Sequence, residues 1–400
     1  MRIVHIEKFL PATGGVGSYL RRLTELQRSR GHEVTHFGCV GPQGPAEMPR
    51  LEDFTAAKGP RALWRMIHNA DAAAKLHAFL RRRPADVAHL HNVYHHLSPS
   101  ILPVLARHGV GIVMTVHDYR LACPTKHFLR PDGPCTRCLP NKFYHAASSR
   151  CAALRGAALG LESFVQRLLR RYFRWISFFL CPTEFMRTVL LRSGVPAKKA
   201  VLCRNVIEPM VLPGNTPQHP GEVLLAGRLS AEKMPELALE LAERLPEARL
   251  VVAGDGPLLS ELQEKVRSRN LANVTLAGHV DHKDLGGYLA RAAAVVVTSR
   301  WFENSPQIML EAMAAGRCVI VPDHPPLREW VRDGHTGRVF APGDPGSLAT
   351  VAREVLFDGN GRAGMERAGK ALVERRHDAA ALLARLEALY EEAIVRCGLR

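Results

Sequence analysis

Short apolar runs alternate with helical patterns along this chain, and the alternation restricts the possible folds more than any other feature. In the first half the apolar runs are residues 2–6, 33–37, 87–91 and 111–116, with amphipathic patterns at 19–30 and 63–83. Strands that alternate with helices form parallel sheets covered by helices on both faces. We therefore expect an α/β fold.

The same alternation restarts after residue 210. Apolar runs follow at 222–226, 249–253, 274–277, 294–298 and 318–322, with helical patterns at 235–243, 257–268, 283–291 and 306–315. A Pro/Gly-rich connection precedes them at 209–221, and a helical tail at 379–397 follows a Gly-rich break at 359–364. We predict domains at 1–207 and 208–375 and a final segment at 376–400. Two doubly wound domains that face each other form a cleft at the carboxyl ends of their strands, where such sheets bind ligands.

The positive charge lies in the first half of the chain. The 400 residues carry a formal net charge of +16, and residues 1–205 hold 31 Lys and Arg against 12 Asp and Glu. The remainder holds 23 against 26. The basic half predicts contact with an anionic partner: nucleic acid, a membrane surface or a phosphorylated substrate. Hydrophobic residues make up 46% of the chain, enough for large cores.

Three features of the sequence predict a cytoplasmic protein. No apolar run approaches the length of about 18 residues that a transmembrane helix needs. The first residues, MRIVHIEKFLP, are too short and too interrupted for a signal peptide and fit a first strand better. Nine cysteines without a secretory signal indicate a reducing compartment, where disulfides are rare.

A Gly-rich loop, ATGGVGSYL, joins the first strand to the first helix. Glycines such as Gly15 let backbone N–H groups approach a phosphate at a helix N-terminus. The spacing G-G-x-G is not the dinucleotide pattern G-x-G-x-x-G. A tight strand-to-helix turn explains this loop equally well.

Two cations follow the first strand of the second domain in the segment LLAGRLSAEKMPELAL. Arg228 and Lys233 stand between this strand and the next helix, where they suit a diphosphate. Two solvated surface cations are the alternative.

Two carboxylates occur in the segment TSRWFENSPQIMLEAMAAG. Ser305 is the expected N-cap of a helix that begins between Glu303 and Glu311. Both carboxylates could accept hydrogen bonds from sugar or ribose hydroxyls. The N–H groups near Gln307 and Ile308, at the start of the helix, could hold phosphate.

A histidine, His117, ends a strand of the first domain. A lone histidine at a strand end is commonly structural, but its place at the ligand-binding edge of the sheet favours a functional role. The next residue, Asp118, could orient the ring or cap the following segment.

Together these motifs resemble the GT-B retaining glycosyltransferases of the family-4 type. The resemblance rests on GGVG, on G-R-x4-K, on the strand-end histidine and on E-x7-E followed by AMAAG. The segments VVAGDGP and GRVFAPGDPGSLA extend it over the whole chain. It implies two Rossmann-like domains facing a cleft, with the final helix crossing back to the first domain.

The resemblance also implies a nucleotide-sugar donor, a UDP or GDP sugar, held mainly by the second domain. Arg228 and Lys233 would bind its diphosphate, Glu311 its ribose and Glu303 the hydroxyls of its sugar. No D-x-D motif occurs in the sequence, so no catalytic metal is expected: the two cations would stabilise the leaving diphosphate instead.

The same resemblance assigns roles to further residues. Gly15 would approach the phosphate, and His117 would face the reaction centre. The backbone near His279 and Val280 would meet the base. With retention and no evident nucleophile, the implied mechanism is front-face attack, in which a donor phosphate oxygen takes the proton of the acceptor.

Four cysteines lie in the predicted loop 118–151. Cys123, Cys135, Cys138 and Cys151 are spaced C-x11-C-x2-C-x12-C, which predicts one tetrahedral zinc of structural role. Reduced thiols packed in a loop are the alternative. In either case we expect this loop to shape the acceptor side of the cleft beside His117.

Arginines and large apolar side chains are interleaved between residues 150 and 175. The arginines are Arg150, Arg155, Arg167, Arg170, Arg171 and Arg174, against one acid, Glu162, and the apolar residues are Leu161, Phe164, Val165, Leu168, Leu169, Tyr172, Phe173 and Trp175. A basic amphipathic helix suits the anionic inner face of the cytoplasmic membrane, and a polyprenyl-linked saccharide would then be the acceptor. A core-packed helix with a solvated Arg face is the alternative.

Two other classes of function compete with this interpretation. A zinc-containing nucleic-acid-binding protein would use the basic half, but it leaves the donor motifs of the neutral-to-acidic half unexplained. We therefore expect no nucleic-acid partner. A sugar-nucleotide epimerase or a phosphorylase would share the GT-B fold with a transferase.

Overall fold

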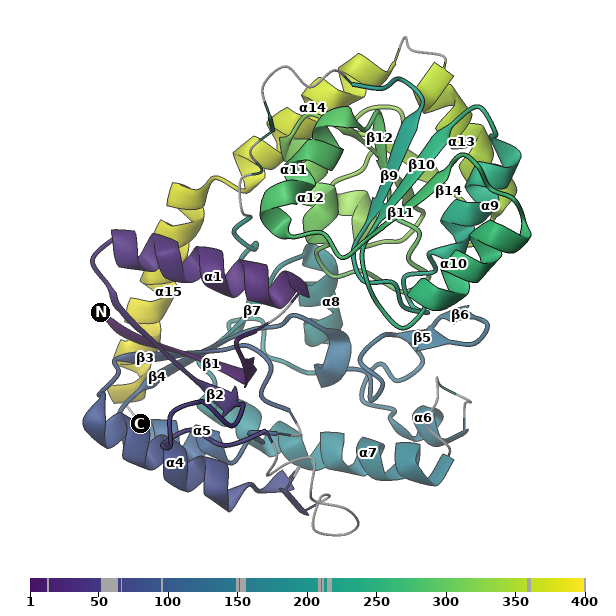
Figure 1. The fold of residues 1–400 in the computed structure, drawn as a ribbon. Coiled ribbons are helices and arrows are strands. Elements are labelled where there is room, and N and C mark those ends of the chain that lie inside the picture. Colours follow the sequence, from purple (N-terminus) through teal and green to yellow (C-terminus); the bar gives the residue numbers. More distant parts are fainter. Residues whose placement is uncertain are drawn as a thin grey trace. The chain divides into compact units, whose positions relative to one another are not determined.

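The computed structural model describes residues 1–12, 14–51, 64–65, 67–94, 96–148, 151, 156–207, 210, 212–213, 218–357 and 361–398. The chain forms two compact units. Unit 1 comprises Met1–Pro131, Cys135–Val206 and Ala379–Arg400, and unit 2 comprises Asp132–Pro134 and Ile207–Asp378. Each unit has its own parallel sheet with helices around it (Figure 1). Arg150, Arg155 and parts of the predicted linker and Gly-rich break lie outside the described residues.

Unit 1 is built on a six-stranded sheet in the order β2-β1-β3-β4-β7-β8. Its strands are β1 (Arg2–Leu10), β2 (Glu33–Val40), β3 (Val87–Leu90), β4 (Gly111–Thr115), β7 (Phe178–Cys181) and β8 (Ala200–Leu202). Its helices are α1 (Gly14–Ser29), α4 (Ala70–Arg82), α5 (Ile101–Arg107), α6 (Tyr144–Ser148), α7 (Gly156–Leu169), α8 (Glu184–Arg192) and α15 (Ala379–Gly398). Two 3₁₀ turns, η1 (Tyr119–Leu121) and η2 (Arg170–Trp175), and a short hairpin, β5 (Leu129–Arg130) and β6 (Gly133–Pro134), lie between them.

Helices α1 and α15 cover one face of this sheet. Tyr19 and Leu23 of α1 and Leu386 and Tyr390 of α15 share one buried cluster with the strand residue Val113. Amphipathic helices bury their apolar stripe in this way, and that burial supplies most of their stability. The two helices thus enclose the side chains of β1, β3 and β4 that point to this face.

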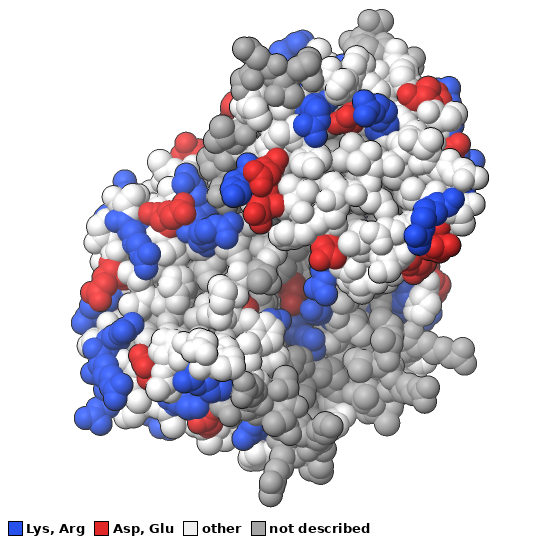
Figure 2. Space-filling model, viewed as in Figure 1, with Lys and Arg blue, Asp and Glu red and all other residues white. Residues whose placement is uncertain are grey.

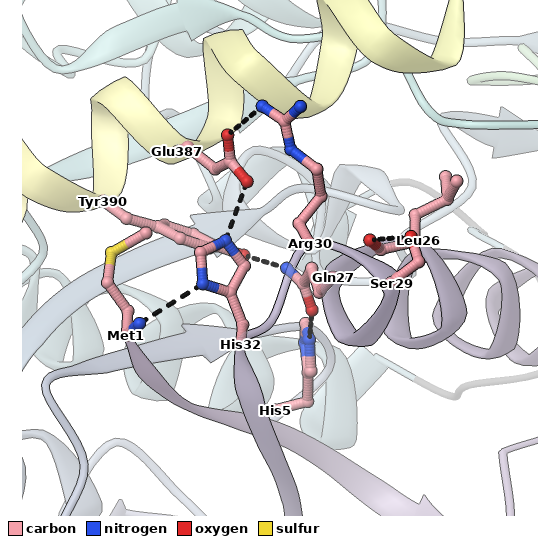
Figure 3. Close-up of polar contacts among 9 residues, drawn as sticks. All are labelled: Met1, His5, Leu26, Gln27, Ser29, Arg30, His32, Glu387 and Tyr390. Carbon is pink, nitrogen blue, oxygen red and sulfur yellow. Dashed lines mark hydrogen bonds and ion pairs between the residues drawn. The ribbon is translucent and has the colours of Figure 1, made fainter.

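The C-terminal helix α15 packs against strand β4 and against the connection between α1 and β2. A Cβ on Gly111 of β4 would lie 2.8 Å from the backbone of Ala393, so glycine permits the close approach. Glu387 accepts hydrogen bonds from Arg30 at 3.1 Å and from His32 at 2.7 Å (Figure 3). The position of α15 is therefore fixed against both ends of the α1–β2 connection.

Unit 2 repeats the parallel design in the order β11-β10-β9-β12-β13-β14. Its strands are β9 (Glu222–Ala226), β10 (Arg249–Ala253), β11 (Val274–Gly278), β12 (Ala294–Val296), β13 (Cys318–Pro322) and β14 (Arg338–Phe340). Its helices are α9 (Glu236–Arg244), α10 (Leu259–Ser268), α11 (His282–Arg291), α12 (Gln307–Ala314), α13 (Pro345–Phe357) and α14 (Arg362–Arg376), with a 3₁₀ turn η3 (Leu327–Glu329). Two large aliphatic clusters fill the two faces of this sheet.

The order of strands in unit 2 reverses between β9 and β12, which pair directly. In open parallel sheets the loops at the carboxyl ends of such neighbouring strands diverge and leave a place for a ligand. The loops after β9 and β12 are therefore where a site is expected in this unit.

Candidate functional site

The loop after β9 carries Arg228 and is braced by the loop after β10. The N–H of Gly227 donates to the carbonyl of Ala253 at 2.9 Å. A Cβ on Gly254 would come within 1.9 Å of the Gly227 oxygen, so only glycine allows this contact. The brace leaves Arg228 exposed at the carboxyl edge of the sheet.

Lys233 and Glu303 form an ion pair in which the carboxylate is buried and the ammonium is partly exposed. The hydroxyl of Ser299 donates to Glu303 Oε1 at 2.5 Å. The hydroxyl of Thr298 donates to the main-chain carbonyl of Lys233 at 2.7 Å. Lys233 Nζ also lies 5.8 Å from the centre of the Trp301 ring. These contacts tie the loop after β12 to the loop after β9 and supply the buried carboxylate with two donors.

Helix α12 begins at Gln307, one residue later than predicted. Pro306 occupies the capping position with extended backbone, and the buried Ser305 hydroxyl has no hydrogen-bond partner. The predicted Ser305 N-cap is therefore wrong, because the extended proline moves the start of the helix beyond the reach of the serine. The first N–H groups of a helix have no intrahelical acceptor. Those of Gln307 and Ile308 thus favour an anion in front of the helix.

Glu311 lies inside α12 and is buried. Its carboxylate meets Nε2 of His282 at 3.2 Å. His282 opens α11, just after the end of β11, where Val280 is half-buried and His279 is exposed. His282 belongs to no motif of the sequence, and its place at the same strand–helix junction is the one signal that points to it.

One small pocket joins several of the predicted residues of unit 2. The side chains and loops that line it include Gly227, Arg228, Lys233, Thr298, Ser299, Glu303, Pro306 and Ile308. Among the described residues, Gln307, Glu311, His279 and Val280 lie outside this lining. Ser299 also lines this pocket. It could not be predicted from the sequence, because a single serine after a short strand is not part of a recognisable motif.

The Gly-rich loop of unit 1 leads into α1. A Cβ on Gly17 would lie 2.4 Å from the carbonyl oxygen of Ala12, so the chain needs glycine for this turn. Gly15 lies exposed in the first turn of the helix. The tight turn thus explains why residue 17 is a glycine. The contact between Gly15 and a phosphate stays a prediction.

His117 is half-buried just beyond the end of β4. Its Nε2 lies 3.0 Å from Nδ1 of His91. Burial lowers the pKa of His117 to about 3, so its ring is neutral at neutral pH. The carboxylate of Asp118 accepts the N–H of Arg120 at 2.9 Å and so caps η1. Asp118 was expected either to orient the His117 ring or to cap the following segment, and this hydrogen bond supports the capping role.

The four loop cysteines are free thiols in a shared neighbourhood. Cys123, Cys138 and Cys151 are buried and Cys135 is half-buried. Burial raises the pKa of Cys138 to about 12, and the other three thiols shift it in the same direction. Within the part of the chain that the structure describes, however, their sulphurs form no set of three within 4.8 Å of one another. Zinc binding stays a prediction.

Two family models match successive parts of the chain. Residues 13–210 match Glycosyltransferase Family 4, and residues 213–372 match Glycosyl transferases group 1. The chain belongs to this family of glycosyltransferases. The loops after β9 and β12 therefore lie in the part of the glycosyltransferase that matches the group 1 model.

Curated relatives of this glycosyltransferase match it over different lengths. A glycogen synthase of Mycobacterium tuberculosis is 36% identical over 144 residues, which is 35% of this chain and 34% of that protein. The match thus spans about a third of the relative. A phosphatidyl-myo-inositol mannosyltransferase of Mycolicibacterium smegmatis is 23% identical over 395 residues, which cover 94% of this chain and 90% of that protein.

Solved structures share the fold of this glycosyltransferase. Sucrose-phosphate synthase of Thermosynechococcus elongatus aligns with a TM-score of 0.73 at 19% identity, over 99% of each chain. Anabaena Alr3699/HepE in complex with UDP-glucose aligns with a TM-score of 0.68 at 16% identity, over 98% of this chain and 100% of that one. The predicted α/β class, with two Rossmann-like GT-B domains, is confirmed.

Proposed function

We propose that the chain is a retaining glycosyltransferase that moves a sugar from a nucleoside-diphosphate sugar to a saccharide or polyprenyl-linked saccharide acceptor. The observation that carries this proposal is the pocket that gathers Arg228, Lys233 and Glu303 beside the start of α12. Two cations and a helix N-terminus suit a diphosphate, and a buried carboxylate suits sugar hydroxyls. The UDP-glucose complex of HepE favours a UDP sugar over a GDP sugar as the first donor to test.

Arg228 and Lys233 act on the leaving group in this proposal. As the bond between the anomeric carbon and the donor diphosphate breaks, negative charge grows on the diphosphate. The exposed guanidinium of Arg228 and the ammonium of Lys233 stabilise that charge. The ion pair with Glu303 holds the ammonium in place before the donor arrives, so little reorganisation is needed during the reaction.

The remaining residues of unit 2 position the donor. Glu303 accepts hydrogen bonds from the hydroxyls of the transferred sugar, and Glu311 accepts those of the ribose. The N–H groups of Gln307 and Ile308 bind the diphosphate. The backbone near His279 and Val280 contacts the base.

The transfer itself proceeds by front-face attack. The acceptor oxygen forms its bond to the anomeric carbon on the face that the diphosphate leaves, and its proton passes to a phosphate oxygen of the leaving group. No metal takes part in this step. In unit 1, Gly15 contacts the phosphate and His117 contacts the reacting sugar.

Ligand-induced stabilisation and product analysis together test this proposal. A panel of nucleotides and nucleotide sugars should contain a compound that raises the melting temperature, since a ligand that binds only the folded state stabilises it. Incubation with that donor and candidate acceptors should release the nucleoside diphosphate only when an acceptor is present. Release of an epimer without an acceptor, or a requirement for inorganic phosphate, would identify the competing GT-B activities instead.

Part of the predicted basic segment supports a peripheral membrane contact. Leu161 and Phe164 of α7 are exposed at 42% and 56%, beside the exposed Arg167. In contrast, Arg170 donates to the carbonyls of Ser193 and Leu121 and is not available. No helix among the described residues is long and apolar enough to cross a membrane.

We propose that this exposed face of α7 binds the anionic inner surface of the cytoplasmic membrane. Flotation with anionic liposomes at low salt tests this contact. Phe164→Ser should reduce the bound fraction, and equal binding by the variant and the wild type would contradict it.

The cysteine loop supports a structural zinc. The described loop holds only short elements, α6, η1 and the two-residue strands β5 and β6, and a bound metal would fix its course. Metal analysis of the purified protein should give one zinc per chain, and Cys138→Ser should remove it. A metal-free wild type would leave the reduced-thiol alternative.

A further inference from the structure

Polar side chains occupy the face of the unit 1 sheet that α1 and α15 cover. His5 of β1 pairs in register with His89 of β3, and side chains two positions apart along a strand share a face. His91, Thr115 and His117 therefore continue the same face toward the carboxyl ends of β3 and β4. A sheet buried on both faces is normally aliphatic here. These residues need partners, because an unpaired buried polar group costs free energy.

The partners are found within the row of histidines itself. His117 Nε2 lies 3.0 Å from His91 Nδ1, and His91 Nε2 lies 3.0 Å from His5 Nδ1. In both pairs the ring centres are 5.3 Å apart and the planes differ by 27°. Rings with these separations meet edge to edge through their nitrogens. Three imidazoles thus form a hydrogen-bonded line from the end of β4 to the middle of β1.

The line continues through α1 and α15. His5 Nε2 lies 2.7 Å from Gln27 Oε1, and Gln27 Nε2 lies 3.0 Å from the hydroxyl of Tyr390 (Figure 3). The same hydroxyl lies 2.6 Å from His89 Nδ1. His89 Nε2 then lies 2.7 Å from the hydroxyl of Thr115. One unbroken path of hydrogen bonds therefore joins His117 to the C-terminal helix α15.

The amide of Gln27 sets the direction of every hydrogen bond in this path. Its oxygen can only accept, so His5 carries its proton on Nε2 and accepts at Nδ1. His91 must then donate from Nε2, and His117 must donate from Nε2 to His91. On the other side, the amide nitrogen of Gln27 donates to Tyr390.

Tyr390 in turn donates its own proton to Nδ1 of His89. His89 therefore carries its proton on Nε2 and donates to Thr115. Burial lowers the pKa of His5 to about 3 and the pKa values of His89 and His91 well below the usual value. All four rings in the path are consequently neutral, with one tautomer each.

Three histidines this close together could instead coordinate a metal ion. His5, His89 and His91 each offer a nitrogen within 4.8 Å of the others. However, both nitrogens of all three rings are engaged in the hydrogen bonds above. A metal would have to replace several short, buried bonds, so hydrogen bonding accounts for this cluster better.

We propose that this path, from Tyr390 through Gln27, His5 and His91, fixes His117 as the neutral tautomer with its proton on Nε2. Tyr390 and Gln27 are then positioning residues for a histidine that they do not touch. The kinetic part of this inference rests on the proposed function of His117 at the reaction centre. The tautomer itself does not, because it follows from contacts within unit 1.

Nitrogen NMR of the full-length protein labelled with ¹⁵N-histidine tests the tautomers without any substrate. Long-range proton–nitrogen correlations distinguish protonated from unprotonated ring nitrogens, and single His→Asn variants assign the signals. We expect His5, His89, His91 and His117 to be neutral, each with its proton on Nε2. A charged ring, or a proton on Nδ1 of any of the four, would overturn the proposed path.

Tyr390→Phe tests whether a change at α15 alters the tautomer of His117. The substitution removes the hydroxyl that contacts Gln27 and His89 and keeps the buried ring. The Gln27 amide then loses the acceptor that orients it, and the His117 signals should show a second tautomer. His36→Phe is the matched control: its ring lies against His5 at 5.6 Å but has no bond to the path. His117 should keep its single tautomer in this control. An unchanged His117 spectrum in Tyr390→Phe would contradict the inference.

Kinetics of the same two variants separate positioning from stability. In Tyr390→Phe we expect kcat to fall about tenfold or more with KM for the donor unchanged, as when an outer partner of a metal-bound histidine is removed. The control should retain wild-type kcat. Equal rates in both variants would overturn the functional link. If the wild type transfers no sugar while its tautomers are as expected, the proposed function fails and the path stands.

Discussion

The two sheets of this protein share a parallel design but differ in what they bury. In unit 2, aliphatic side chains of β9, β12 and β13 pack on both faces of the sheet, and the charged residues of its pocket stand on loops beyond the strand ends. Unit 1 instead buries a row of histidines between its strands and α1 and α15. The difference shows that this fold tolerates a polar layer when each buried nitrogen has a partner. The polar groups of the unit 2 pocket line an opening at the edge of the sheet, whereas the histidines of unit 1 hydrogen-bond to one another and to α1 and α15 inside it.

The surface of unit 1 gives no sign of this internal layer. In Figure 2, Lys and Arg side chains are spread around α1 and α4 and alternate with Asp and Glu on the face shown. The excess of positive charge in the first half is thus distributed on this face rather than gathered into one stripe.

The largest expected effect concerns the charged loops of unit 2. Lys233→Ala removes a cation that stabilises the leaving group, so kcat should fall by about 10² to 10³. The stability of the unit 1 sheet should not change, because Lys233 makes its contacts within unit 2. Steady-state kinetics and amide exchange measure the two effects. Lys265→Ala is the control, because this half-buried lysine of α10 pairs with Glu261 outside the pocket. Similar activity in both variants would contradict the leaving-group role.

Acid should affect unit 1 more than unit 2. The pKa of His5 is about 3 in the folded protein, so between pH 6.5 and 3 only the unfolded chain binds its proton. Stability is therefore present above pH 6.5 and is lost as the pH falls, by about 2 kcal/mol at pH 5 for His5 alone. Glu7 acts in the opposite sense, because burial raises its pKa to about 7, but the several buried histidines outweigh it.

Amide exchange read by mass spectrometry at pH 5 and pH 7 tests this difference. After correction for the intrinsic pH dependence, peptides from β1, β3 and β4 should lose protection at pH 5. Peptides from β9, β10 and β12 should lose less. Equal loss in both sheets would show that the buried histidines are not the cause.

A smaller effect is expected from the backbone contact that braces Arg228. Gly254→Ala places a Cβ 1.9 Å from the carbonyl oxygen of Gly227. The two loops must separate, which should cost unit 2 about 2 to 3 kcal/mol. Gly287→Ala in α11 is the control, since alanine inside a helix is neutral or stabilising. Chemical denaturation measures both variants, and a wild-type midpoint for Gly254→Ala would show that the loops adjust freely.

The smallest effect concerns Ser299. Ser299→Ala removes one of the two donors to the buried Glu303 carboxylate while the ion pair with Lys233 remains. A single hydrogen bond contributes about 0.5 to 1.5 kcal/mol net, and Lys233 still pairs with the carboxylate, so binding of the donor sugar should weaken by roughly tenfold or less. Calorimetry with the nucleotide and with the nucleotide sugar separates the two parts of the ligand. A loss confined to the nucleotide would contradict the role of Glu303.

Much of the fold could be predicted from local patterns. The strands β9, β10 and β13 begin and end where the apolar runs predict, because each run is bounded by glycine, proline or charged residues. Helix starts depend on more than the apolar pattern. The beginning of α12 was misplaced because the backbone of Pro306 is extended, and neighbouring letters do not reveal that conformation.

The candidate site of unit 2 could be predicted in part. Arg228, Lys233 and Glu303 stand at strand–helix junctions, and junctions of parallel strands converge at one edge of a sheet. Ser299 and His282 were missed because each is a single polar residue whose partner lies elsewhere in the chain. Their roles depend on contacts of 2.5 Å and 3.2 Å that sequence spacing does not encode.

The sequence by itself determined the alternation of strands and helices, the two sheets and the charged residues at their edges, because these follow from local periodicity and turn residues. Only the tertiary structure decided what the histidines do. His5, Gln27, His91 and Tyr390 are separated by up to hundreds of positions, and none of them belongs to a sequence motif. Their bonds exist because the register of β1 and β3 and the packing of α1 and α15 bring them within reach of one another.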